Sequence, residues 1–112
     1  SMPANLVIDA DRTWRPPGWV YNHVVSHLAQ RFMAHDRELS DFFERCLGPE
    51  NPTFDWRSLS PQRQEAASAE IRHLMKKVMH SGESVMAEPI FLEQLRAELS
   101  ELTRMVGATS AI

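Results

Sequence analysis

The sequence has little cysteine and no long hydrophobic run. Cys46 is the one cysteine, so an intramolecular disulfide is impossible, and this usage favours a reducing compartment such as the cytoplasm. No apolar stretch approaches the roughly 20 residues that span a bilayer, so we expect no membrane association. The N-terminal residues also lack the charged-then-apolar order of a secretory signal, which again predicts a cytoplasmic protein.

Glycine and strand-forming patterns are scarce as well. The chain has 4 glycines among 112 residues, and no repeated alternation of polar and apolar residues indicates a large sheet. The formal net charge of −3 argues against sequence-independent binding to nucleic acid, because such binding depends on a basic surface. A hydrophobic content of 43% is typical of a globular chain, and the length suits a single domain.

Residues 19–47 carry apolar side chains at the spacing of an amphipathic helix. His35 and Asp36 interrupt the apolar face. The segment is therefore either one helix with a polar pair on its apolar side, or two helices, the second with Asp36 as its N-cap. We favour the break, because an aspartate in the N-cap position accepts a hydrogen bond from the first helical turn. Gly48 and Pro49 are expected to end the segment.

Two further segments have helical periodicity. Ser60 as N-cap and Pro61 at the first helical position predict a helix over 60–81. A last helix is expected over about 89–106. Gly107 is expected to end it, because glycine readily adopts the left-handed conformation that follows many helices.

The predicted fold is all-α: an irregular bundle of three or four amphipathic helices with an extended N-terminal leader. The apolar run 6–8 in the leader suits a short strand or an extended anchor, and we expect no second buried strand after it. In the connector we expect Phe54, Trp56 and Leu59 to pack under the bundle. The predicted limits are 1–18 for the leader, 19–107 for a single helical domain and 108–112 for a frayed tail.

The last helix carries a continuous apolar stripe. Its members follow one another at steps of three and four residues and share one helix face: Leu92, Leu95, Leu99, Leu102 and Val106. Phe91 and Met105 widen the face to about 140°, which is typical of a helix packed on a globular core. We therefore interpret the stripe first as a wall of the chain's own core and second as a homodimer contact. The candidate interface residues are Phe91, Leu95, Leu99, Leu102 and Met105.

Residues 9–13 follow the apolar run 6–8 with the pattern D-x-D-x-T. This arrangement resembles the first motif of haloacid-dehalogenase-type phosphotransferases. The resemblance implies Asp9 as nucleophile and Asp11 as general acid/base, with Mg²⁺ between them. That family also requires a parallel sheet with a lysine and further acidic residues at later strand ends. The predicted helices provide no such sheet, so we interpret the match as chance and expect a chain without catalytic activity.

His23 and His27 have the spacing H-x-x-x-H, which places two imidazoles on one helix face, as a metal site requires. The pair lies opposite the apolar arc, so we expect both side chains to face solvent, and the same helix offers no third ligand nearby. Our first expectation is therefore a chain with no metal and no cofactor. Metal binding by His23 and His27 is the alternative.

Basic residues line the outer face of the 60–81 helix. Cations in the last turns of a helix complement its macrodipole, which accounts for them without a ligand. Anion binding is the alternative explanation. The candidate residues are Arg72, Lys76, Lys77 and His80.

The combination of amphipathic helices with no convergent catalytic set favours a small non-catalytic protein-interaction module. Inhibitors, immunity or antitoxin-like proteins and regulatory accessory proteins belong to this class. We expect a protein partner, and a homodimer is a further candidate. The alternatives are a ligand- or metal-binding helical bundle and a homo-oligomeric structural protein.

Overall fold

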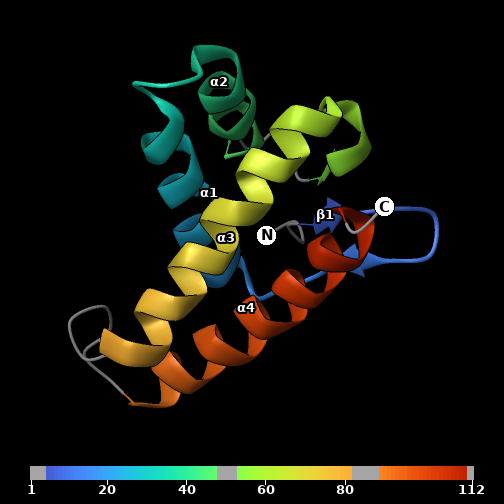
Figure 1. The fold of residues 1–112 in the computed structure, drawn as a ribbon. Helices are drawn as coiled ribbons and strands as arrows, with labels where there is room; N and C mark the ends of the chain where they lie inside the picture. The colour runs from blue at the N-terminus through green and yellow to red at the C-terminus, as the bar shows by residue number, and fades with distance from the viewer. Residues whose placement is uncertain (1–4, 48–52, 82–88, 111–112) are drawn as a thin grey trace.

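The structure is a computed structural model that describes residues 5–47, 53–81 and 89–110. Helices dominate these residues, which confirms the predicted all-α bundle with an extended N-terminal leader. Figure 1 shows the course of the chain. The elements in chain order are β1 (Asn5–Val7), β2 (Thr13–Trp14), α1 (Gly18–Phe32), α2 (Arg37–Cys46), β3 (Thr53–Asp55), the 3₁₀ turn η1 (Trp56–Ser58), α3 (Pro61–Ser81) and α4 (Pro89–Ser110).

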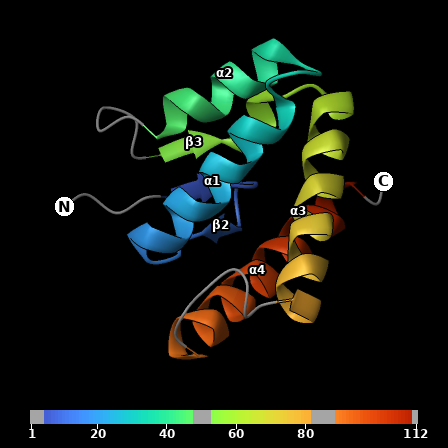
Figure 2. The ribbon, with the colours of Figure 1, turned by 90° about the vertical axis from the view of Figure 1, so that its left-hand side faces the viewer.

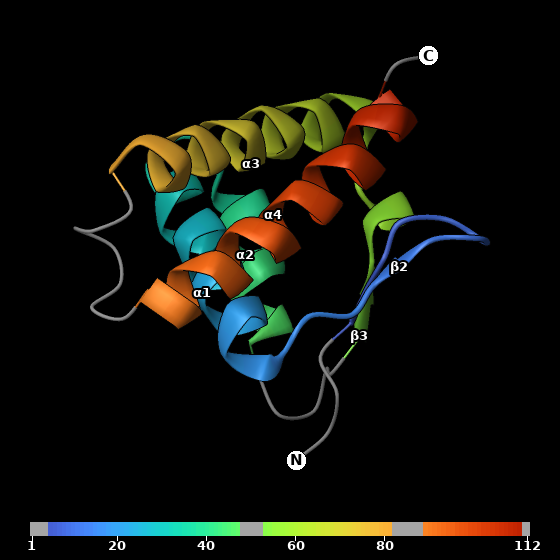
Figure 3. The same ribbon diagram turned by 90° about the horizontal axis from the view of Figure 1, so that it is seen from below.

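The helices pack as two pairs. Helix α1 makes most of its contacts with α2, and α3 makes most of its contacts with α4 (Figures 1 and 2). Helices α1 and α3 also touch, so the pairs share one core. A view from below places the small sheet to one side of the helices (Figure 3).

The predicted break at Asp36 is confirmed. Helix α1 ends at Phe32, and the backbone N–H of Asp36 donates to the carbonyl oxygen of Phe32 at 2.9 Å. Asp36 then adopts an extended conformation as N-cap of α2, and its carboxylate accepts from the N–H of Leu39 at 3.2 Å. The segment 19–47 is therefore two helices joined by a tight turn. Gly48 and Pro49 lie outside the described residues.

The leader is extended, as predicted, and it also pairs into a sheet. Strand β1 runs antiparallel to β2 and parallel to β3, so the sheet order is β2-β1-β3. The prediction that no second strand accompanies residues 6–8 is therefore wrong. Strands of two or three residues are too short to leave a periodic signal, so this pairing could not be predicted from the sequence. Leu6, Ile8 and Trp14 are buried in the same core as the helices.

Helix α3 begins as predicted. The N–H of Arg63 donates to Oγ of Ser60 at 3.3 Å, and Pro61 occupies the first helical position. In the connector before it, Trp56 and Leu59 are buried, as expected, while the side chain of Phe54 lies outside the described residues.

Helix α4 runs beyond its predicted end at Gly107 and continues to Ser110. Its backbone through residues 108–110, which we expected to be frayed, is helical, and residues 111–112 lie outside the described part. Gly107 does not adopt a positive φ angle, and glycine ends a helix in the predicted way only when it does so. The glycine is thus an ordinary helical position.

The apolar stripe of α4 lies in the core, which confirms its first interpretation. All five members are buried: Leu92, Leu95, Leu99, Leu102 and Val106. Full burial of one leucine side chain contributes about 1.5–3 kcal/mol to stability, so the stripe is a major part of the core. Within the described residues, no helix combines the length and apolar character needed to cross a membrane.

Candidate functional site

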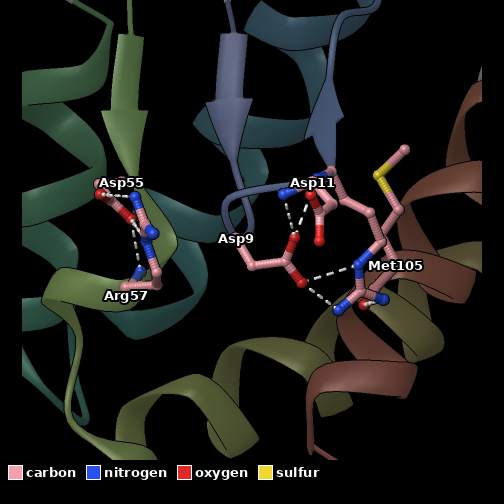
Figure 4. A network of polar contacts seen from close by, with 6 residues as sticks. Asp9, Asp11, Asp55, Arg57 and Met105 are labelled. Carbon is pink, nitrogen blue, oxygen red and sulfur yellow. Dashed lines mark hydrogen bonds and ion pairs between the residues drawn. The ribbon is translucent and has the colours of Figure 1, made fainter.

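The acidic residues of the D-x-D-x-T motif form a closed turn between β1 and β2 (Figure 4). Oδ1 of Asp9 accepts hydrogen bonds from the backbone N–H groups of Asp11 at 2.9 Å and Arg12 at 2.8 Å. Oδ2 accepts from Nε of Arg12 at 2.8 Å and also pairs with its Nη2. The same guanidinium donates from Nη1 to the carbonyl oxygen of Met105 at 3.1 Å, which ties the turn to α4.

These hydrogen bonds give the side chain of Asp9 a structural role in closing the turn. The hydrogen bond from Arg12 is the main reason that the pKa of the Asp9 carboxyl lies below its ordinary value. Both carboxylate oxygens are engaged within the turn, whereas a nucleophile or magnesium ligand needs a free lone pair directed at its target. Asp11 contributes its backbone N–H to the turn and exposes its side chain.

A second carboxylate–guanidinium pair lies beside the first, at the end of β3 (Figure 4). Asp55 accepts from Nε of Arg57 at 2.9 Å and from Nη2 at 2.8 Å. The hydrogen bond from Arg57 lowers the pKa of Asp55. This pair was not predicted from the sequence, although an aspartate two residues before an arginine in a turn was the available signal. Asp9 and Asp55 therefore each pair with an arginine of their own at this edge of the sheet.

Cys46 is buried in the core, where it packs as a small apolar residue. Burial raises the pKa of its thiol to about 12, so the thiolate required of a nucleophile is not formed at neutral pH. Its carbonyl oxygen accepts from the hydroxyl of Tyr21 at 3.2 Å, which ties α1 to the end of α2.

His23 and His27 line one open hollow on the outer face of α1. The hollow has a volume of about 540 Å³, and Trp19, Asn22, Ser26 and Gln30 complete its lining. Both histidines border this open hollow, away from the apolar face of α1 as predicted, but they are partly buried rather than fully exposed. The helical angle correctly places them away from the α1 core face, but α3 approaches that side as well and brings Glu70 against His27.

The surroundings of the two imidazoles favour their neutral forms. Partial burial is the main cause of the lowered pKa of His23, and repulsion by His27 adds to it. Burial also lowers the pKa of His27, against the opposing effect of Glu70, whose Oε1 lies 3.4 Å from Nε2. Oε1 of Glu70 in turn lies 3.1 Å from Nε of Arg31. No group of three His, Cys, Asp or Glu side chains in the described ranges is placed to hold a metal ion.

An exposed apolar surface lies where the first turns of α1 and α4 meet. The rings of Trp19 and Phe91 contact each other edge to face, with centroids 5.5 Å apart. Phe91 is nevertheless 43% exposed and its neighbour Ile90 is 69% exposed. We call Trp19, Ile90 and Phe91 the Trp19 patch.

The candidate interface residues separate into two groups. Four of them lie inside the core of the chain, and only Phe91 reaches the surface. The buried four are Leu95, Leu99, Leu102 and Met105. Of these candidates, only Phe91, in the first turn of α4, is available for a contact that leaves the core closed.

The candidate anion-binding residues lie on the outer side of α3. Lys76, Lys77 and His80 are exposed, and Arg72 is partly exposed, with its Nη2 3.5 Å from Oε1 of Glu65. A second hollow, of about 350 Å³, lies between α2 and the start of α3. Arg63 on its wall already pairs with Asp36 and Glu38, at 2.8 and 3.1 Å.

The sequence matches no protein-family model and no curated protein, and the fold matches no solved structure. A functional proposal for this chain therefore rests on its own residues and their arrangement. Two surfaces differ from an ordinary solvated helix face: the Trp19 patch and the hollow with two histidines. They adjoin each other, because Trp19 belongs to both.

Proposed function

We propose that this chain is a small non-catalytic module that binds another protein through the Trp19 patch. The observation that carries the proposal is the 43% exposure of Phe91, whose ring contacts the partly buried ring of Trp19, together with the 69% exposure of the adjacent residue Ile90. Large apolar side chains gathered at one place on a surface are typical of contact sites. Aromatic residues also supply much of the binding energy in protein interfaces.

The partner we propose is a protein with an apolar side chain that inserts beside Phe91. Burial of most of the exposed area of Ile90 and Phe91 would supply about 1–2 kcal/mol for each residue. An inhibitor, an immunity or antitoxin-like protein or a regulatory accessory protein uses this kind of contact. A homodimer through the same patch is the second candidate, because an exposed apolar surface can bind its own copy.

We propose as part of this function that the chain is not an enzyme, and three features support this. The carboxylates of Asp9 and Asp55 are held by their own arginines, and the Cys46 thiol is buried. The presence of one cysteine, which cannot form a disulfide within the chain, also supports the proposal of a cytoplasmic location.

The test compares Phe91→Asp with Met33→Asp. Both variants place a carboxylate at an exposed apolar position, since Met33 is 49% exposed, but Met33 lies about 21 Å from Trp19 along α1. We expect affinity capture from the native lysate, with quantitative mass spectrometry, to find a stoichiometric partner with the wild type and Met33→Asp. We expect Phe91→Asp to lose that partner.

Light scattering of the purified proteins tests the homodimer. A dimer that Phe91→Asp dissociates and Met33→Asp preserves identifies the partner as a second copy of the chain. Capture of the same proteins by all three forms, together with a monomeric wild type, contradicts the proposal.

A further inference from the structure

The hollow on α1 contains two imidazoles in a fixed relation to each other. His23 and His27 are four residues apart within the continuous helix α1, so their Cβ atoms lie on the same side, about 6 Å from each other. Both line the same open hollow. Two donors that a helix holds at this spacing bind a metal ion together, because the second bond forms without further loss of freedom.

A contact with α3 orients one of the two rings. Nε2 of His27 lies 3.4 Å from Oε1 of Glu70. An ionised carboxylate only accepts hydrogen bonds, so this contact assigns the proton of a neutral His27 to Nε2 and leaves the lone pair on Nδ1. Metal-binding histidines in proteins are commonly held by a carboxylate in this way.

We propose that His23 and His27 form a labile binding site for a late first-row divalent cation, such as Cu²⁺, Ni²⁺ or Zn²⁺. Imidazole nitrogen is a preferred donor for these ions and a poor one for Mg²⁺ or Ca²⁺. Glu70 is a positioning residue that holds the ring of His27. This proposal does not rest on the contact proposed for the Trp19 patch, although Trp19 lines both surfaces.

The charges around the hollow limit the affinity of this site. Arg31 shares the carboxylate of Glu70, and Lys77 lies close enough to His27 to act on it electrostatically. No third His, Cys, Asp or Glu joins the pair in the described part of the chain. Water therefore fills the remaining coordination positions, and the ion exchanges readily.

Calorimetric titration of the tag-free protein with Ni²⁺ tests the proposal. We expect one Ni²⁺ for each chain. His23→Ala and His27→Ala should each weaken binding on the order of 100-fold, because each leaves a single donor. Glu70→Ala should weaken it about 10-fold, as expected for a partner that only orients a ligand. His73→Ala removes an exposed imidazole from α3 and should leave the affinity unchanged.

Nuclear magnetic resonance of the wild type gives a readout that requires no variant to fold. Paramagnetic Ni²⁺ below one equivalent should broaden the ring signals of His23 and His27 and spare those of His35, His73 and His80. Equal broadening of all five histidines shows an adventitious ion only and overturns the proposal. Binding that survives both single alanine variants, or no binding at all, overturns it as well.

Discussion

Replacement of Asp36 by alanine should lower the free energy of unfolding by about 2 kcal/mol, because this carboxylate makes two separate stabilising contacts. It caps the first turn of α2 through the N–H of Leu39, at 3.2 Å. It also accepts from Nε and Nη2 of Arg63, at 2.8 and 3.1 Å, and so ties the turn between α1 and α2 to α3.

The expected loss in the free energy of unfolding is the sum of the contributions of these two contacts. Loss of an N-cap aspartate costs about 1 kcal/mol. The pair with Arg63 is partly screened by solvent, since the two side chains are 27% and 35% exposed, and it contributes about 0.5–1 kcal/mol. Asp36→Asn retains an oxygen for the cap and loses the charge, so its cost should be about half that of Asp36→Ala.

Urea unfolding followed by circular dichroism measures these differences. The set consists of the wild type, Asp36→Ala, Arg63→Ala and the double variant, which together form a thermodynamic cycle. We expect a coupling of about 0.5–1 kcal/mol between the two residues. A loss below about 0.5 kcal/mol for Asp36→Ala, or a coupling of zero, would refute the reasoning.

The pH dependence of the stability provides a second test of the role of Asp36. The hydrogen bond from Arg63 lowers the pKa of the Asp36 carboxyl from its ordinary value of 3.8. Its stabilisation is therefore fully present above that value and is lost as the pH falls through the lowered pKa of the folded state. The stability gap between the wild type and Asp36→Asn should be constant from about pH 5 to 7 and should close below about pH 4.

Two further substitutions test the core and the last helix. Leu99→Ala should lower the free energy of unfolding by about 2–5 kcal/mol in urea titrations, because the side chain is fully buried; a loss below about 1 kcal/mol would contradict its place in the core. Gly107→Ala should increase the free energy of unfolding by about 0.5–1 kcal/mol and so raise the midpoint temperature of thermal unfolding. The position is helical, and no neighbouring atom lies within 4 Å of an added Cβ. A lower midpoint would show that the helix does end at this glycine.

The features that the sequence predicted correctly depend on short stretches of chain. The break at Asp36 and the start at Ser60 are capping interactions within three residues, so their signals are contained in the local sequence. The burial of the α4 stripe follows from a periodicity that extends over four helical turns. Both kinds of signal are independent of where the rest of the chain lies.

The features that the sequence did not predict depend on contacts between residues that are far apart in the chain. The pairing of β1 with β3 joins three-residue segments far apart in sequence. The partial burial of His27 depends on Glu70, which lies on another helix. Helical angle alone placed the histidines correctly on α1, but it contains no information about which neighbour covers that face.

The position of β1 in the middle of the sheet has a consequence for the order of folding. The first strand of the chain has two partners, and one of them, β3, ends at Asp55. During synthesis from the N-terminus, β1 therefore cannot pair with β3 until the first two helices and the connector have left the ribosome. Closure of this long loop costs entropy before its contacts are gained, so the sheet edge is expected to form late. The small sheet thus makes the final position of the first strand dependent on the connector that precedes α3.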